Sequence, residues 1–109
     1  MAYDEDLAER IRERLVHRND VVEKKMFGGL AFLVRGNMAV AASGEGGLLV
    51  RCEPAASADH IEAGAEPMIM RGKPMSGWLR VSADAASDDG ELERWVDVGA
   101  AYAATLPPK

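Results

Sequence analysis

The side chains best suited to chemistry are one cysteine, Cys52, and two histidines, His17 and His60. A thiol becomes a nucleophile when a cation or a helix start lowers its pKa, and an imidazole carries protons or binds metals. Cys52 occupies an apolar position of an alternating segment without that surrounding, so we predict a buried, unreactive thiol. Neither histidine has a cysteine or carboxylate at metal-ligand spacing, so we expect surface or half-buried imidazoles and no metal. A remote histidine partner for Cys52 leaves a small Cys-dependent enzyme or ligand carrier as one alternative.

The glycine-rich segment at residues 43–47, Ser-Gly-Glu-Gly-Gly, is the part of the chain most similar to a phosphate-binding loop. It lacks the lysine of the GxxxxGK[ST] motif, and the carboxylate of Glu45 would repel a phosphate. We therefore predict a hairpin loop. The sequence also lacks the GxSxG, HExxH and EF-hand motifs. We expect a protein that is not an enzyme, with no catalytic residue and no cofactor.

Two basic segments and several methionines remain. Lys24-Lys25 is followed by Met26-Phe27-Gly28-Gly29, and the segment from Pro67 to Val81 contains cations but no acid. If these strands are neighbours, they form a positive patch beside flexible thioethers, which suits a protein partner. The alternative is that the cations protect sheet edges and the methionines fill the core. The predicted partner-binding residues are Lys25, Met26, Phe27, Met70, Arg71, Lys73, Trp78 and Arg80.

Composition limits the classes of protein further. The chain has 109 residues, 48% of them hydrophobic and 28% charged, as in one globular domain spanning residues 1–109. A formal net charge of -5 argues against general affinity for nucleic-acid phosphates or an anionic membrane. A nucleic-acid-contacting regulatory subunit is therefore an alternative rather than the first choice. We expect a cytoplasmic protein, because the chain has no signal-peptide pattern, no apolar run of about 20 residues and a single cysteine.

Hydrophobic periodicity predicts the elements that carry these residues. Leu7, Ile11 and Leu15 recur at helical spacing, and Asp4 or Asp6 is the expected N-cap. The predicted helices are 4–18, 55–63 and a last helix that is capped by Ser87 and stopped by Pro107. The predicted strands are 21–27, 30–34, 38–42, 48–53, 68–71 and 78–81. Residues 83–89 are expected to be a short connection.

We interpret Gly28-Gly29 as a bulge or bend that interrupts one strand, which makes residues 21–53 a three-stranded meander. The strand at 30–34 is apolar on both faces, and the next hairpin is expected to turn at Gly36-Asn37 with type II′ geometry. In the strand at 48–53, alternation places Cys52 on one face and Arg51 on the other. The order α-β(3)-α-β(2)-α predicts an α+β fold with an antiparallel sheet and helices on one side.

Several segments resemble the TfoX (Sxy) N-terminal domain family. They are KMFGGLAF at residues 25–32, GNMA at 36–39, LLVRC at 48–52, MRGKPMSGWLRV at 70–81 and the closing helix at 92–106. The resemblance implies a two-layer α-β(3)-α-β(2)-α fold similar to the secretion-chaperone-like architecture. It also implies regulation: the namesakes control natural competence, act in transcription with other proteins and carry a further C-terminal domain. We expect this chain to be a stand-alone member without that domain, and the resemblance supplies no catalytic residues.

We therefore predict a non-enzymatic protein-interaction module, in which apolar anchors on the sheet are surrounded by cations that attract an acidic partner. The partner itself is not identified by the sequence. Self-association through the sheet or a terminal helix would give a homodimer, and membrane binding is not expected.

Overall fold

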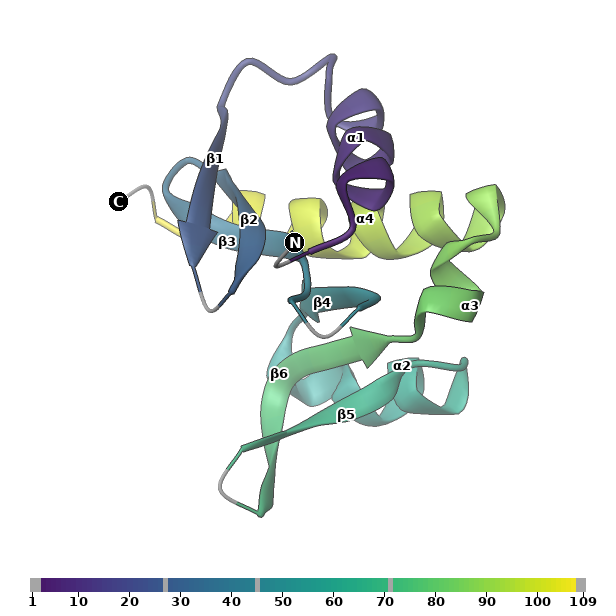
Figure 1. The fold of residues 1–109 in the computed structure, drawn as a ribbon. Coiled ribbons are helices and arrows are strands. Elements are labelled where there is room, and N and C mark those ends of the chain that lie inside the picture. Colours follow the sequence, from purple (N-terminus) through teal and green to yellow (C-terminus); the bar gives the residue numbers. More distant parts are fainter. Residues whose placement is uncertain (1–2, 27, 45, 71, 108–109) are drawn as a thin grey trace.

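A six-stranded antiparallel sheet organises the chain, in the spatial order β1-β2-β3-β4-β6-β5. The computed structural model describes residues 3–26, 28–44, 46–70 and 72–107. The strands are β1 (Val21–Met26), β2 (Gly29–Val34), β3 (Asn37–Ala42), β4 (Leu48–Arg51), β5 (Glu66–Met70) and β6 (Lys73–Val81). The helical elements are α1 (Glu5–Arg14), the 3-10 turn η1 (Pro54–Ala56), α2 (Ser57–Glu62), α3 (Ala83–Ala86) and α4 (Asp89–Thr105). Figure 1 shows α4 running along the sheet beside α1.

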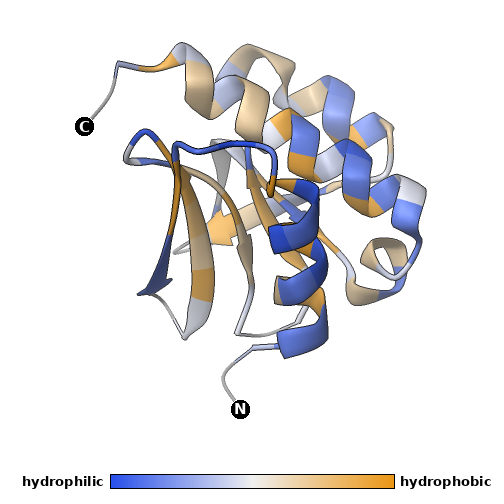
Figure 2. Ribbon diagram, turned by 90° about the horizontal axis from the view of Figure 1, so that it is seen from above, coloured by the Kyte–Doolittle hydropathy of each residue, from blue (hydrophilic) through white to orange (hydrophobic). Residues whose placement is uncertain are grey.

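The main core lies between the sheet and the helices. Trp95 and Ile11 from the helices and Phe32 from β2 are buried, together with the alternating residues Val50 of β4 and Leu79 of β6. Figure 2 shows hydrophilic and hydrophobic residues alternating along both α1 and α4, as expected for helices with one buried side. This arrangement confirms the α+β class with antiparallel strands and helices packed on the sheet.

Both long helices begin at aspartates whose side chains accept backbone hydrogen bonds. Asp4 caps α1 by accepting from the amides of Asp6 and Leu7, as the sequence suggested. The cap of α4 is Asp88, which accepts from the Glu91 amide, and not Ser87. Residues 83–89, predicted as a short connection, contain the short helix α3, which is capped by Ser82.

The strand count differs from the predicted α-β(3)-α-β(2)-α order. Gly28 has φ 74 and precedes a reversal of the chain, so β1 and β2 pair antiparallel from Met26↔Gly29 onward. The glycine pair therefore makes a hairpin instead of a bulge within one strand, and four strands precede η1. Gly29 has no room for a side chain, because a Cβ there would lie 2.3 Å from the Ala42 carbonyl oxygen.

The β2–β3 hairpin also turns one residue earlier than predicted. Val34 pairs with Asn37, so the two turn residues are Arg35 and Gly36. Their φ angles are 54 and 86, both positive, which fits a type I′ turn and excludes type II′. Its pairing with Val34 makes Asn37 the first residue of β3, and its buried side chain reaches the end of the chain, where Nδ2 donates to the Pro107 carbonyl over 2.9 Å.

Candidate protein-binding face

The second face of the sheet is also apolar, although no helix contributes to it among the described residues. Ala31, Ala41 and Leu49 form a separate buried cluster, with exposed fractions of 0%, 5% and 8%. Leu33, Met38 and Met68 are partly buried and pack against this cluster. We call the side of the sheet that carries these six residues the helix-free face.

Strand register arranges the helix-free face in rows across the sheet. One row crosses all six strands, because Lys24 pairs with Ala31, Ala31 with Ala41, Ala41 with Leu49, Leu49 with Arg80, and Arg80 with Glu66. Its centre therefore consists of small or apolar side chains, while its ends are charged. At about 4.8 Å between strands, Lys24 and Arg80 are roughly 19 Å apart. The Arg80 guanidinium also donates to the Gly46 carbonyl over 3.5 Å.

Arg51 lies at the edge of the helix-free face, next to α4. It pairs with Trp78 across β4 and β6, and alternation places both on the side opposite Val50 and Leu79. The Arg51 guanidinium carbon lies 5.4 Å from the centre of the Trp78 ring and 5.7 Å from the Tyr102 ring of α4. These are cation–π distances, so two aromatic rings hold the charge at the place where the sheet meets the end of α4.

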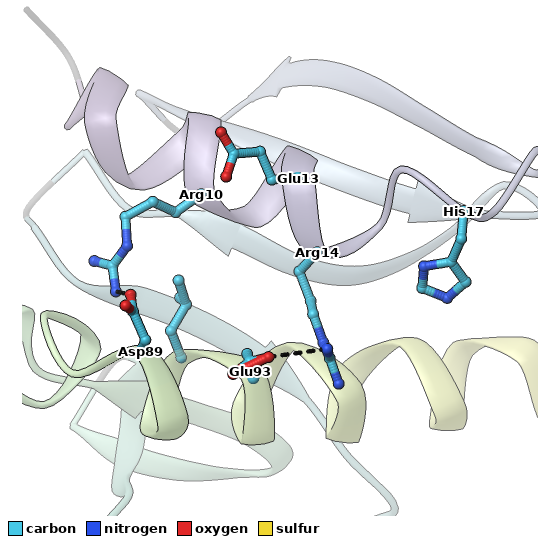
Figure 3. A pocket seen from close by; sticks show the side chains of 7 residues that line it. Arg10, Glu13, Arg14, His17, Asp89 and Glu93 are labelled. Carbon is cyan, nitrogen blue, oxygen red and sulfur yellow. Dashed lines mark hydrogen bonds and ion pairs between the residues drawn. The ribbon is translucent and has the colours of Figure 1, made fainter.

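Three arginines in or just after α1 form ion pairs with carboxylates of the same chain. Arg10 pairs with Asp89 at 2.6 Å, Arg14 with Asp97 at 2.6 Å, and Arg18 with Asp20 at 3.2 Å. Figure 3 shows Arg10 and Arg14 pointing from α1 towards Asp89 and Glu93 of α4, across a cavity of about 410 Å³. Because both arginines of this cavity contact carboxylates of α4, they offer little to an added anionic ligand.

Arg12 ties α1 to the edge strand β1. It contacts Glu9 and also donates from Nε and Nη2 to the two carboxylate oxygens of Glu23, each over 2.6 Å. The hydrogen bond to Glu23 raises the pKa of Arg12, and the corresponding bond from Arg12 lowers the pKa of Glu23. Glu23 lies opposite Phe32, on the helix side of the sheet, so this ion pair leaves the helix-free face unobstructed.

The predicted partner-binding residues do not form one patch. Lys25 lies on β1 and Lys73 on β6 beside β5, so the two basic segments lie near opposite edges of the sheet. They also lie at opposite ends of the strands, because Lys25 adjoins the β1–β2 turn while Lys73 pairs with Met70 at the far end of β5. The condition that these strands are neighbours is therefore not met.

The remaining predicted residues are distributed as follows. Trp78 and Arg80 do share one face of β6, the helix-free face. Phe27 and Arg71 lie outside the described residues, and Met26 and Met70 are described by their backbone alone. Arg51 was not selected from the sequence, although the alternation that buries Cys52 had placed it on the opposite face. Its contact with Trp78 depends on the β4–β6 register, which no local pattern reveals.

Cys52 is buried, as the alternation predicted, with 1% of its surface exposed. Its Sγ lies 3.7 Å from the Ser57 hydroxyl oxygen, and it lines a cavity of about 530 Å³ together with His60. The half-buried His60 ring stacks edge-on against Trp95, with 5.7 Å between ring centres, while His17 is exposed. Within the described ranges, no three His, Cys, Asp or Glu residues are grouped so that they could hold a metal ion.

Comparison with known proteins places this arrangement in a family. None of the described helices is both long and apolar enough to cross a membrane. A search of curated proteins finds no match. The sequence model of the TfoX N-terminal domain matches residues 13–103, a span that begins within α1, includes every strand and ends within α4. The chain therefore belongs to the TfoX N-terminal domain family.

Proposed function

We propose that this chain is a non-enzymatic, regulatory protein-interaction domain that binds its partner through the helix-free face. One observation carries the proposal: Leu33, Met38 and Met68, which pack over the buried cluster of Ala31, Ala41 and Leu49, are themselves only partly buried. Antiparallel sheets that face water on one side normally alternate apolar with polar residues, whereas strands covered on both sides are apolar throughout. In β2, five of the six residues are buried and Leu33 is half-buried. Another molecule would then contact the partly buried side chains Leu33, Met38 and Met68 that cover this cluster.

The non-enzymatic part of the proposal is supported by the surroundings of the reactive groups. Cys52 is buried and adjoins a hydroxyl group instead of a base, and the arginines of the α1–α4 cavity contact carboxylates of the same fold. The family supports a regulatory role in general terms. Competence and transcription remain the particular roles that the resemblance suggests.

Site-specific photo-crosslinking tests the proposed face. A photoreactive amino acid replaces Val22 or Lys24, both exposed residues of β1 whose partners Leu33 and Ala31 lie on the helix-free face. Lys25 is the matched control, because it is an exposed neighbour on the same strand that pairs with Leu30 on the helix side. Each variant is irradiated in extract of the cells that naturally produce the protein, after circular dichroism has confirmed folding.

The expected result is one recurrent protein adduct from positions 22 and 24 and much less of it from position 25. Adducts confined to position 25, or equal at all three positions, would contradict the assignment of the face. No protein adduct at any position would contradict the binding function itself.

A further inference from the structure

The two edges of the sheet differ in how well they are protected against another strand. An edge strand presents unpaired N–H and C=O groups, and natural proteins often protect such edges with proline or a bulge. On β5, Pro67 has no N–H to donate, and the register with β6 shifts between Pro67 and Ile69. On β1, the strand contains no proline, and its pairing with β2 has no register shift. These two protections are therefore found at the β5 edge and not at the β1 edge.

The hydrogen-bond pattern shows which backbone groups of β1 point away from the sheet. The Arg35 amide donates to the Asp20 carbonyl over 3.0 Å, so these residues, just outside β1 and β2, are a hydrogen-bonded pair. Hydrogen-bonded and non-hydrogen-bonded pairs alternate along an antiparallel ladder, so Lys24, four residues after Asp20, also bonds to β2. The N–H and C=O groups of its neighbours Glu23 and Lys25 therefore point outwards.

This edge is open to a second strand. Residues 22–25 of β1 are exposed, and β1 is the outermost strand of the sheet (Figure 1). Helix α1 packs against α4 and β3, farther into the sheet, and reaches β1 through the ion pair between Arg12 and Glu23. Because that ion pair lies on the helix side of the sheet, it leaves the outward backbone groups of β1 accessible.

The charges of β1 favour a second copy of the same strand as the occupant of this edge. When two β1 strands pair antiparallel around a two-fold axis at Lys24, Glu23 of each copy lies opposite Lys25 of the other. Both residues have outward backbone groups, so the pair can exchange N–H···O bonds, and both side chains lie on the helix side. Lys25 is exposed and forms no ion pair with any residue that the structure describes. This register therefore matches backbone donors with acceptors and opposite charges with each other.

We infer that two copies of this chain join through β1, antiparallel and in this register, so that their sheets become one continuous sheet. The two-fold axis is perpendicular to the sheet, so the helix-free faces of both copies lie on the same side. The inference does not depend on the proposed function, because it concerns the strand edge and not the face. One contact opposes association: the two Lys24 side chains meet at the axis, and like charges directly opposite destabilise a strand pair. The dimer should therefore dissociate on dilution.

Sedimentation velocity over a concentration series up to about 1 mM measures the association. Lys25→Glu turns both Glu–Lys contacts into Glu–Glu contacts and should weaken the dimer at least about tenfold. Lys24→Thr is the matched variant: it removes the repulsion at the axis and should strengthen the dimer about two- to fivefold. Both variants make the protein more acidic, so opposite effects cannot come from net charge. Circular dichroism confirms that each variant folds.

An exchange of charges tests the Glu23–Lys25 contact. Lys25→Glu chains carry glutamate at both positions and Glu23→Lys chains carry lysine at both, so each chain alone should dimerise poorly. In a mixture of the two, both contacts regain opposite charges, and a heterodimer should form with an affinity close to that of the wild type. Glu23→Lys also loses the ion pair with Arg12, so its folding is checked before mixing.

Disulfide formation locates the two-fold axis. In Lys24→Cys, the new thiols face each other across a non-hydrogen-bonded pair, where Cβ atoms are about 4.5–5.5 Å apart, close to the spacing of a disulfide. In the control Lys25→Cys, the thiols are diagonal to each other at about 7–8 Å. Lys24→Cys should therefore form the covalent dimer faster. Cys52 is buried and does not compete.

Several results would overturn the inference. A protein that stays monomeric up to about 1 mM would do so, and so would weaker association of Lys24→Thr. Equal disulfide formation at positions 24 and 25 would exclude the register, and charge-exchanged chains that stay monomeric when mixed would exclude the Glu23–Lys25 contact. A dimer that slows amide exchange in β5, and not at Glu23 and Lys25, would place the interface on the other edge. In the photo-crosslinking experiment, a self-adduct has twice the mass of the chain, which distinguishes it from the adduct of a protein partner.

Discussion

Replacing Gly99 by alanine should destabilise the protein, although alanine is the better helix former. Gly99 lies in the middle of α4 where this helix crosses β3. A Cβ at this position would lie 2.3 Å from the Ala39 carbonyl oxygen and 2.6 Å from Cγ1 of Val40. The first of these atoms is backbone, so it cannot move without shifting β3 or the whole helix. Gly99 therefore sets the distance between the two layers.

Two opposing effects determine the size of the change. Helix propensity favours alanine over glycine by about 1 kcal/mol in a helix interior. Inserting a methyl group into a packed core typically costs about 1–3 kcal/mol, and a clash with backbone lies at or above the upper end of that range. The free energy of unfolding of Gly99→Ala should therefore fall by about 2 kcal/mol, from a cost of about 3 and a gain of about 1. For a domain of this size, the melting temperature should fall by roughly 10 °C.

Urea denaturation followed by tryptophan fluorescence measures this difference, with Gly90→Ala as the control. Gly90 belongs to the first turn of the same helix, and the atom nearest to its added Cβ is a carboxylate oxygen of Asp88 at 3.3 Å. That oxygen also caps α4 by accepting from the Glu91 amide, but it needs to shift by only a few tenths of an ångström, so Gly90→Ala should change the free energy of unfolding by less than about 1 kcal/mol. A Gly99→Ala protein as stable as the wild type would refute the view that backbone contact holds α4 at this distance from β3.

Three further predictions follow from individual contacts. Glu23→Gln should lower the free energy of unfolding at pH 7 by about 0.5–1 kcal/mol in urea titrations at low salt, and this difference should shrink as the pH falls through the acid range in which folded Glu23 becomes protonated. The bond from Arg12 lowers the pKa of folded Glu23, so its stabilisation is present above the unfolded value near 4.3 and is lost as the pH falls through the folded value. Asn37→Ala should cost about 1 kcal/mol and speed amide exchange near Pro107, because it removes the bond from Asn37 to that carbonyl. Native Cys52 should react with a disulfide reagent only at the rate of unfolding, and rapid modification of the folded protein would revive the Cys-dependent alternative.

Local patterns in the sequence predict most of the elements but not their neighbours. The periodicity of Leu7, Ile11 and Leu15 predicts α1, and the Ser43–Gly47 loop forms the predicted hairpin between β3 and β4. The prediction of a bulge at Gly28-Gly29 is wrong. A bulge and a tight turn can both place a glycine at positive φ, as Gly28 is here, and only the pairing of β1 with β2 distinguishes the two. Such pairing is not encoded within a few residues.

The site was less predictable for the same reason. Grouping the two basic segments required β1 to adjoin β5 or β6, but β4 pairs with β6, which places β1 and β5 at the two edges. Alternation alone assigned Arg51 to the correct face of β4. Its contacts with Trp78 and Tyr102 join residues that are 27 and 51 positions away in sequence, so they appear only when the layers are assembled.

The helix-free face is apolar beyond its own buried cluster. Ala31, Ala41 and Leu49 are buried and contribute to the stability of the domain, whereas Leu33, Met38 and Met68, which pack against them, are only partly buried. The helical layer differs, because α1 carries charged residues that pair with carboxylates of α4. The sheet instead leaves Leu33, Met38 and Met68 partly exposed on the same face as the exposed cation Lys24. An apolar centre with charge at its margin is the usual anatomy of a protein interface, and this is the physical reason to look for a partner on this side.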